Sequence, residues 1–258
     1  MARIELHAVP DLPRVRPGDD LVALTLAGLE AAAIGVRDGD VLVFAQKVVS
    51  KAEGRIVDLA TVKPSPRALE VASIVCKDAR LVELILSEST RIVRQQANVL
   101  IVEHRLGFVM ANAGVDQSNV DDGTHGEFAL LLPADPDASA ARLRAELKQR
   151  AGVDVGVLIN DSFGRPWRRG AVGVAIGSAG LVALRDLRGQ PDLFGRTLRV
   201  TEVGLADEMA SAASMLMGQA DEGLPVVLLR GLARDLVRHT PHSPAATLVR
   251  AAHEDLFR

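Results

Sequence analysis

The sequence is poor in cysteine and in aromatic residues. Cys76 is the only cysteine among 258 residues, so no disulfide can form within the chain, as is typical of a reducing compartment. The chain has one tryptophan and no tyrosine, and aromatic residues make up 3% of it. Aromatic platforms on which nucleic-acid bases stack are therefore not expected. Cys76 follows an apolar stretch, and we interpret it as a small apolar residue rather than a nucleophile.

Positive charge and long hydrophobic runs are also lacking. Lysine and arginine number 30 against 33 acidic residues, which gives a net charge of -3. A duplex-binding protein usually carries a basic excess or a basic stripe, so we expect no nucleic-acid partner. The longest apolar stretches, such as residues 173–184, are too short to cross a bilayer. With no signal-peptide pattern at the start, we expect a cytoplasmic protein without a membrane partner.

Several familiar functional motifs are missing as well. The sequence has no P-loop, no glycine-rich dinucleotide fingerprint after a strand, no G-x-S-x-G nucleophile turn and no zinc-binding spacing of Cys and His. Four histidines fall in segments that we expect to be exposed: His125, His239, His242 and His253. Enzymatic chemistry in this chain would therefore rest on carboxylates, lysines, arginines and hard metal ions.

The spacing of apolar residues predicts both strands and helices. Strands are expected at residues 4–8, 40–49, 92–94, 99–103, 108–111, 153–159, 171–176, 198–203 and 226–229. Helices are expected at residues 21–33, 66–76, 78–87, 134–150, 205–217 and over the last fifteen residues. Because strands occur both in runs and between helices, the pattern favours an α+β fold with mixed sheets and flanking helices. No linker divides the chain, so we expect one domain over residues 1–258; two structural lobes within it remain an open alternative.

Polar residues follow two of the predicted strands. Lys47 and Lys51 come at the end of a buried strand, where cations suit phosphate groups, although a solvated turn explains this pattern more simply. Asp116, Ser118 and Asn119 follow the strand at 108–111 in a loop that contains glycine. Their oxygen atoms suit Mg²⁺ or Mn²⁺ held together with substrate phosphates, and a capped turn explains them equally well.

Two further segments combine acidic and basic residues. Asp161 and Ser162 end an apolar strand, and three arginines and the only tryptophan follow within residues 165–169. A carboxylate and a hydroxyl for a metal beside guanidinium groups is a layout for phosphoryl transfer, and we favour it over a basic surface turn. The acidic, glycine-containing loop at 217–225 is typical of an ordinary helix-to-strand connection. Glu208, on the preceding helix, is either part of a solvated face or a site residue.

Taken together, these segments resemble the coenzyme F420:gamma-glutamyl ligase family. The resemblance is carried by residues 49–55, 112–119, 161–170, 173–177, 206–208 and 217–225, which occur in the family's order across nearly the whole chain. It implies a fold specific to the family and an intertwined homodimer. It also implies coenzyme F420-0 and L-glutamate as substrates, GTP as the phosphoryl donor, Mg²⁺ or Mn²⁺, and an assisting K⁺.

The resemblance further implies a role for individual residues. Asp116, Asp161 and Ser162 would hold the divalent metal. Lys51, with Arg165 or Arg168, would stabilise charge in the transition state. The residues that would line the nucleotide site are Asp11, Leu12, Pro13, Arg14, Gln46, Lys47, Lys51, Asn119, Met217, Gly218, Gln219, Ala220, Asp221, Glu222, Gly223 and Leu224. Gln46 and Lys47 stand where small hydroxyl residues can occur in relatives, and Ser162 stands where threonine can occur.

The reaction implied by the resemblance is the formation of an amide in two steps. GTP would phosphorylate the terminal carboxylate of the precursor, and the amino group of glutamate would then displace phosphate from the acyl phosphate. Repeated additions would extend a gamma-linked polyglutamate tail. An arginine of the 165–169 segment would hold the carboxylate of the incoming glutamate.

Two alternatives to a ligase remain open. The same carboxylates would serve a metal-dependent phosphohydrolase, which would release phosphate from GTP without glutamate. A non-catalytic nucleotide- or deazaflavin-binding protein would keep the cationic sites without turnover. Within the ligase interpretation, the chain is either a stand-alone enzyme or a module of a longer protein with a flavin-dependent domain.

Overall fold

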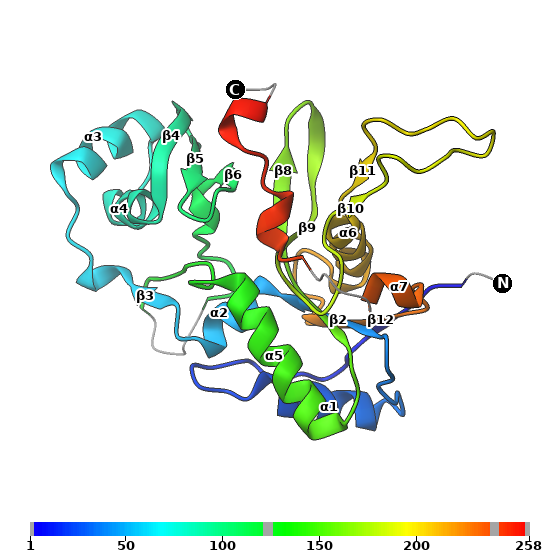
Figure 1. The fold of residues 1–258 in the computed structure, drawn as a ribbon. Helices are drawn as coiled ribbons and strands as arrows, with labels where there is room; N and C mark the ends of the chain where they lie inside the picture. Colours follow the sequence, from blue (N-terminus) through cyan, green and yellow to red (C-terminus); the bar gives the residue numbers. More distant parts are fainter. Residues whose placement is uncertain (1–2, 121–125, 238–242, 256–258) are drawn as a thin grey trace.

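A five-stranded mixed sheet forms the centre of the molecule. The structure is a computed structural model that describes residues 3–120, 126–237 and 243–255 (Figure 1). The strands in spatial order are β1 (Glu5–Ala8), β12 (Val226–Arg230), β2 (Val41–Ala45), β8 (Gly156–Arg165) and β9 (Arg168–Ala179). Only β2 and β8 pair in parallel within this sheet, and the other neighbours are antiparallel. The expected α+β class with mixed sheets is confirmed.

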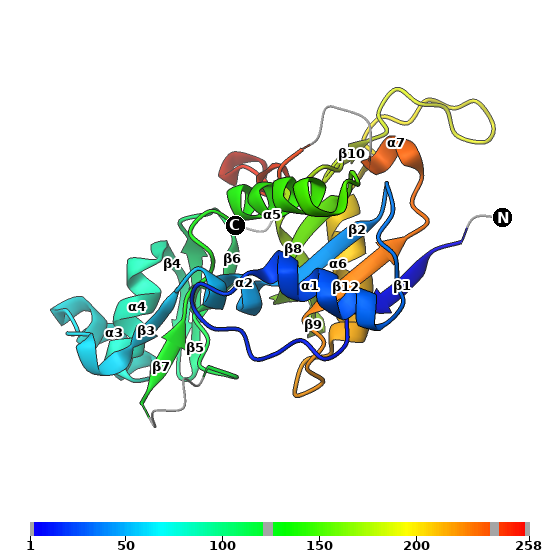
Figure 2. The same ribbon diagram turned by 90° about the horizontal axis from the view of Figure 1, so that it is seen from below.

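Helices cover both faces of the central sheet (Figure 2). One face packs against α1 (Leu21–Ala31) and α5 (Pro136–Ala151), and the other packs against α6 (Leu205–Met217). The first hydrophobic core lies on the α1 and α5 side of the sheet, and the second lies on the α6 side. Strand β2 contributes to both, because Leu42 and Phe44 belong to the first core and Val41 and Val43 belong to the second. Successive side chains of a strand point to opposite faces, so an uninterrupted apolar strand needs cover on both sides.

A third hydrophobic core lies beside the central sheet, in the part of the chain that Figure 1 draws in cyan and green. Its sheet contains β4 (Ser89–Gln96), β5 (Val99–His104) and β6 (Val109–Ala111), and its helices are α3 (Pro66–Val75) and α4 (Ala79–Ser87). A two-stranded ribbon of β3 (Ile56–Asp58) and β7 (Phe128–Leu130) accompanies them. The assignment of residues 1–258 to one domain stays a prediction.

Local capping signals in the sequence fix the starts of two helices. The side chain of Asp20 accepts a hydrogen bond from the backbone N–H of Ala23 at 2.9 Å and caps α1. Ser65 likewise caps α3, with Pro66 at the first helical position. Both helices begin at the residue that the sequence predicted, because a cap depends only on residues within one turn.

The strand predicted over residues 40–49 is wrong beyond Ala45. Strand β2 ends there and helix α2 (Gln46–Ala52) begins at once. Val48 and Val49 have β-branched side chains that favour a strand, but in the helix both are buried in the first core. Packing on that core outweighs their intrinsic preference.

The C-terminal prediction is also wrong. Residues 244–255, the described part of the last fifteen residues, contain two short 3₁₀ turns, at Ala245–Leu248 and Ala252–Glu254, instead of a helix. The N–H groups of Ala245 and Ala246 bond to the carboxylate of Asp137, at the start of α5, at 2.7 and 3.2 Å. These bonds attach the segment to a residue 108 positions away, so the local composition of the segment does not indicate them.

Other differences concern exposure and strand length. Cys76 is exposed and ends α3 in a left-handed conformation with φ 53°, so it is not a buried apolar residue. The strand expected at 198–203 shrinks to β11 (Glu202–Val203), which pairs with β10 (Arg185–Asp186). A short α7 (Arg234–Val237) and the β3–β7 ribbon were not anticipated. His253 is exposed, while His125, His239, His242 and most of the polar loop at 123–127 lie outside the described residues.

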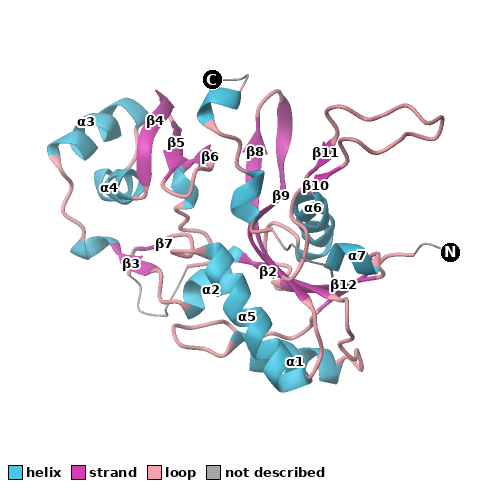
Figure 3. Cartoon of the chain, in the orientation of Figure 1, coloured by secondary structure: helices cyan, strands magenta, loops and turns pink. Residues whose placement is uncertain are grey.

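Two antiparallel segments project from the body of the molecule (Figure 3). The β8–β9 hairpin carries Trp167, which is 87% exposed. The long loop between β10 and β11 carries Leu193 and Phe194, which are 99% and 96% exposed. Over the described part of the chain, every helix is too short or too polar to cross a membrane.

Strand β9 lies at the edge of the sheet and is covered by helix α6. Asp207 accepts a hydrogen bond from the N–H of Ala175 at 2.9 Å, and Ser211 donates one to the carbonyl of Gly173 at 2.7 Å. A Cβ atom at Gly173 would lie 2.4 Å from the carbonyl oxygen of Ala210. The glycine therefore permits a close approach of helix and strand, and the helix side chains occupy backbone groups of the edge.

Candidate functional site

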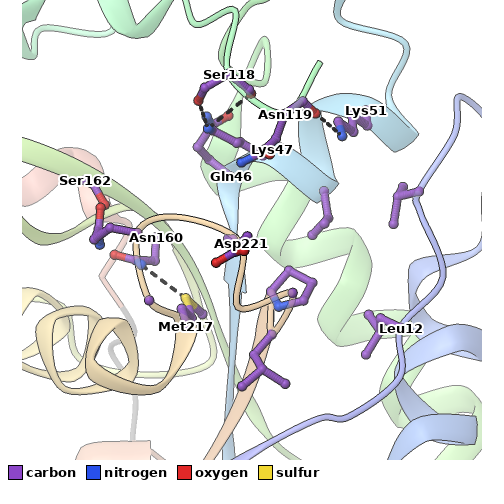
Figure 4. A pocket seen from close by; sticks show the side chains of 18 of the residues that line it. Leu12, Gln46, Lys47, Lys51, Ser118, Asn119, Asn160, Ser162, Met217 and Asp221 are labelled. Carbon is purple, nitrogen blue, oxygen red and sulfur yellow. Dashed lines mark hydrogen bonds between the residues drawn. The ribbon is translucent and has the colours of Figure 1, made fainter. Parts of the chain in front are cut away.

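A cavity of about 540 Å³ opens where strand β2 ends beside strand β8 (Figure 4). Strand β8 continues to Arg165, so Asp161 and Ser162 lie within it and not at its end as the sequence predicted. Ala45 and Asn160 face each other at the last parallel pair of these strands, so the residues that follow emerge side by side. Lys47 comes from the β2 side, and Asp161 and Ser162 come from the β8 side. Open α/β sheets bind ligands at the carboxyl ends of their parallel strands. Here the carboxyl end of the β2–β8 pair carries both basic side chains and a carboxylate.

Segments that are far apart in the sequence complete the cavity wall. The predicted site residues that line it are Leu12, Pro13, Arg14, Gln46, Lys47, Lys51, Asp116, Asn119, Asp161, Ser162, Met217, Gly218, Gln219, Ala220, Asp221, Gly223 and Leu224. Four predicted residues are not part of the lining: Asp11, Glu222, Arg165 and Arg168. The fold thus brings most of the predicted set together, and their roles stay predictions.

Lys47 forms the central ion pair of the cavity. Its Nζ lies 2.9 Å from Oδ2 of Asp116 and donates a 2.6 Å hydrogen bond to the hydroxyl of Ser118. The carboxylate of Asp116 also accepts a 2.7 Å bond from the N–H of Ser118. Burial opposes ionisation of Asp116, but the bonds from Lys47 and Ser118 outweigh it and lower the pKa of this carboxyl. Asp116 is therefore held as a carboxylate at neutral pH.

Lys51 is the second lysine, one helical turn after Lys47. Its Nζ donates a 2.7 Å hydrogen bond to the carbonyl of Asn119. Burial and the neighbouring charges of Lys47 and Arg14 lower the pKa of Lys51. The side chain of Asn119 in turn donates to the carbonyl of Ala220 at 3.2 Å and joins the 116–119 loop to the 217–225 loop.

Asp161 has the opposite electrostatic environment. Burial, with a further contribution from the charge of Asp116, raises the pKa of Asp161 to about 7. Its only hydrogen bond within the described residues comes from the N–H of Ser162 at 2.8 Å. A partly buried carboxyl beside a second carboxylate is stabilised in its ionised form by an added cation.

Asn160 supplies a further oxygen to this region. Its amide nitrogen donates to the hydroxyl of Ser214 at 3.0 Å and to the sulfur of Met217 at 3.4 Å. Its Oδ1 is buried and has no hydrogen-bond partner among the described residues. Unpaired buried oxygens are uncommon, so this atom lacks a partner that a ligand, ion or water would provide.

The oxygen-rich composition of the cavity suits a hard divalent cation. Asp116 and Asp161 provide carboxylates, Ser118 and Ser162 provide hydroxyls, and Asn160 provides a free amide oxygen. Across the described ranges, however, no group of three or more His, Cys, Asp or Glu residues could hold a metal. A Mg²⁺ or Mn²⁺ ion here would therefore share its coordination with substrate phosphates or water.

The predicted residues outside the lining have identifiable places. Arg165 and Arg168 face each other near the tip of the β8–β9 hairpin, and Arg165 donates to the carbonyl of Gly170 at 2.9 Å. Glu222 accepts a 2.8 Å bond from the N–H of Ala220 and so shapes the cavity loop from behind. Asp11 directly precedes the lining segment, in a left-handed conformation with φ 54°.

The family resemblance assigned no role to six lining residues: Val15, Ala45, Val48, Ser118, Asn160 and Pro225. The sequence had already indicated Ser118, with Asp116 and Asn119, as a candidate oxygen ligand. Asn160 precedes Asp161 in another of the polar segments, and its side-chain oxygen could have indicated it. Val15, Ala45, Val48 and Pro225 are apolar, and no local pattern distinguishes them from core residues.

The same segments carry a sequence relationship. The pattern of the F420-0:Gamma-glutamyl ligase family matches residues 11–231, which include every part of the cavity wall. The chain belongs to the F420-0:gamma-glutamyl ligase family. This is a family of enzymes, and it is the family that the sequence motifs resembled.

Individual relatives match over nearly the full length of the chain. The coenzyme F420:L-glutamate ligase of Methanothermobacter thermautotrophicus is 46% identical over 255 residues, which are 99% of each chain. That of Methanopyrus kandleri is 47% identical over 255 residues, 99% of this chain and 98% of the relative. That of Archaeoglobus fulgidus is 44% identical over 230 residues, 89% and 88% of the two chains. These relatives place the ligase family in coenzyme F420 biosynthesis.

Proposed function

We propose that this chain adds L-glutamate to coenzyme F420-0 in a GTP-dependent reaction and extends the gamma-linked glutamate tail. The observation that supports this most directly is the cavity itself. Residues from family-matching segments at 11–15, 45–51, 116–119, 160–162 and 217–225 line one space of about 540 Å³. The residues there are cationic and oxygen-rich, as a nucleoside triphosphate and its metal require.

The proposed nucleotide site uses the three cations of the lining. Arg14, Lys47 and Lys51 come from two separate segments and converge on the cavity. Their charges suit the phosphates of GTP, and the 217–224 loop supplies backbone groups on the opposite wall. Burial and the neighbouring cations lower the pKa of Lys51, so an anion bound beside it would stabilise its charged form.

The proposed metal ligands are Asp116, Asp161 and Ser162. A bound Mg²⁺ or Mn²⁺ would neutralise charge on the transferring phosphoryl group. The high pKa of Asp161 and the unpaired Oδ1 of the adjacent Asn160 support a cation at this edge. K⁺ belongs to the proposal as an assisting ion without an assigned ligand.

The chain's own residues would orient two successive substitutions. The precursor carboxylate attacks the terminal phosphorus of GTP, and the bond to GDP breaks. The amino nitrogen of glutamate then attacks the acyl carbon, phosphate leaves, and an amide forms. Lys51 would stabilise the charge that develops on the phosphoryl oxygens. Arg165 and Arg168 lie beyond Ser162 on the hairpin, where a substrate that extends out of the cavity along β8 would meet them.

A homodimer and a cytoplasmic location complete the proposal. Trp167, Leu193 and Phe194 are large apolar side chains that the single chain leaves almost fully exposed. Such residues on projecting segments are typical of surfaces that a second chain covers. Sedimentation of the purified protein measures the oligomeric state directly, and a monomer at micromolar concentration would contradict this part of the proposal.

The activity test is mass spectrometry of coenzyme F420-0 incubated with the protein, L-glutamate, GTP and Mn²⁺. Each component is omitted in turn. We expect mono- and oligoglutamylated products that depend on every component. Glutamate-independent release of phosphate from GTP, without product, would favour the phosphohydrolase alternative. GTP binding without either activity would favour a non-catalytic binding protein.

The Asp116→Asn substitution tests the metal assignment in the same assay. We expect the loss of metal-dependent turnover, because the amide removes the charge that holds a divalent cation. Glu70→Gln is a matched control, since the exposed side chain of Glu70 pairs, in the described part of the chain, only with Arg67 on α3. Near wild-type activity of Asp116→Asn would contradict the assignment.

A further inference from the structure

Lys47 contacts Asp116, the carboxylate to which the proposed function assigns a metal ion. Its Nζ is 2.9 Å from Oδ2 of Asp116, 2.6 Å from the Ser118 hydroxyl and 3.3 Å from the Ser118 carbonyl. An ammonium group has three N–H donors, and these three oxygens are enough to engage them all. The side chain therefore acts as a compact cation in an oxygen-lined position.

The two oxygens of Asp116 are both engaged in this arrangement. Oδ1 accepts the N–H of Ser118 at 2.7 Å, and Oδ2 accepts the Ser118 hydroxyl at 3.0 Å in addition to Lys47. The contact with the Ser118 backbone is fixed by the turn. Lys47 has a flexible four-carbon stem and is 31% exposed, so it is the partner that can leave.

The cavity wall contains as many acidic as basic residues. Three cationic residues line it, Arg14, Lys47 and Lys51, and so do three acidic residues, Asp116, Asp161 and Asp221. A divalent metal alone adds two positive charges to a site whose best carboxylate already has a cation. A nucleoside triphosphate brings the negative charge that a displaced lysine would pair with.

We propose that Lys47 is an internal counter-ion of Asp116 that a divalent metal must displace. The metal then binds weakly by itself and binds well with the nucleotide, whose phosphates receive the released ammonium group. This inference rests on the metal assignment of the proposed function and goes beyond it, because it concerns the order and coupling of binding. It also gives Lys47 a role distinct from that of Lys51.

Lys51 provides a matched control for the charge of Lys47. It lies on the same helix and lines the same cavity, but among the residues that the structure describes its Nζ bonds to the carbonyl of Asn119 and to no carboxylate. Replacing either lysine by methionine removes one positive charge from the cavity and keeps an unbranched side chain. Only the Lys47 substitution frees an oxygen of Asp116.

The experiment measures Mn²⁺ binding to the nucleotide-free full chain by electron paramagnetic resonance of free Mn²⁺, at one fixed pH. We expect Lys47→Met to bind Mn²⁺ about fivefold more tightly than wild type, the upper end of the effect of a partly exposed ion pair. Lys51→Met should change the affinity less, and Asp116→Asn should weaken it. With a non-hydrolysable GTP analogue present, the advantage of Lys47→Met over wild type should disappear.

Each other outcome is decisive. If Lys47→Met binds Mn²⁺ no more tightly than wild type while Asp116→Asn loses binding, the counter-ion inference is wrong and the metal assignment stands. If Asp116→Asn binds Mn²⁺ as well as wild type, the metal assignment fails and the inference fails with it. Thermal unfolding monitors the fold of each variant, and Lys47→Ser, a change to a small hydroxyl residue, serves as the second test of the same contact.

Discussion

Replacing Glu88 by glutamine should destabilise the protein, and by less in acid than at neutral pH. Glu88 ends helix α4 with a side chain that is 12% exposed. Oε1 lies 3.1 Å from Arg55 Nη2, and Oε2 lies 2.9 Å from Arg105 Nε and 3.4 Å from His104 Nε2. Arg55 also donates to the carbonyl of Leu132, so this cluster joins the third core, which contains α4, to the segment that leads into α5.

The pKa of Glu88 sets the magnitude of the effect. Burial alone would raise it, but the approach of His104 and Arg105 and the charge of Arg55 outweigh burial and lower the pKa from 4.5 to about 2. At about 1.4 kcal/mol per pKa unit, ionised Glu88 contributes roughly 3 kcal/mol to the free energy of unfolding. Because the pKa is lowered in the folded state, this contribution is complete above pH 4.5 and is lost as the pH falls toward 2.

Urea denaturation followed by circular dichroism tests this prediction. Wild type and Glu88→Gln should differ by roughly 3 kcal/mol at pH 7 and by about 2 kcal/mol at pH 3.5. Glu70→Gln removes an exposed carboxylate on a neighbouring helix and should stay within about 0.5 kcal/mol of wild type. A difference for Glu88→Gln that is the same at both pH values would refute the electrostatic explanation.

Two further substitutions probe packing and buried charge in the central sheet. Asp40 is almost fully buried and holds Arg230 through bonds of 2.8 and 2.6 Å, so Asp40→Ala should cost about 3–5 kcal/mol in urea denaturation by leaving a guanidinium unpaired. A cost below about 1 kcal/mol would mean that water reaches Arg230. Gly173→Ala should cost about 1–3 kcal/mol, because its Cβ would meet the carbonyl of Ala210 at 2.4 Å, whereas Gly164→Ala meets nothing within 4 Å and should be nearly neutral. Equal melting temperatures for the two glycine variants would contradict the close approach of α6 and β9.

Local structure was predictable wherever the deciding contacts are local. The caps at Asp20 and Ser65 act within one turn, and the apolar strands at β2, β8 and β12 follow from their composition alone. The helix Gln46–Ala52 could not be predicted in this way. Its valines prefer strands, and only their burial in the first core selects the helix.

The sequence by itself determined the class of fold, the family and the residue types available to the site. Its polar segments contain the lysines, carboxylates and hydroxyls that the proposed phosphate and metal site uses, and their order carries the family relationship. These properties depend only on the types of residues and on their order, so they can be predicted without the tertiary structure.

Only the tertiary structure decided which of these residues meet. Parallel pairing of β2 with β8 puts Lys47 and Asp161 at the same end of these two strands. The 116–119 loop brings Ser118 to Lys47, although the two residues are 71 positions apart in the sequence. The same fold leaves Arg165 on a projecting hairpin and outside the cavity wall. The burial that raises the pKa of Asp161, and the ion pair that lowers that of Asp116, arise from these long-range contacts, since neither carboxyl has a charged neighbour beside it in the sequence.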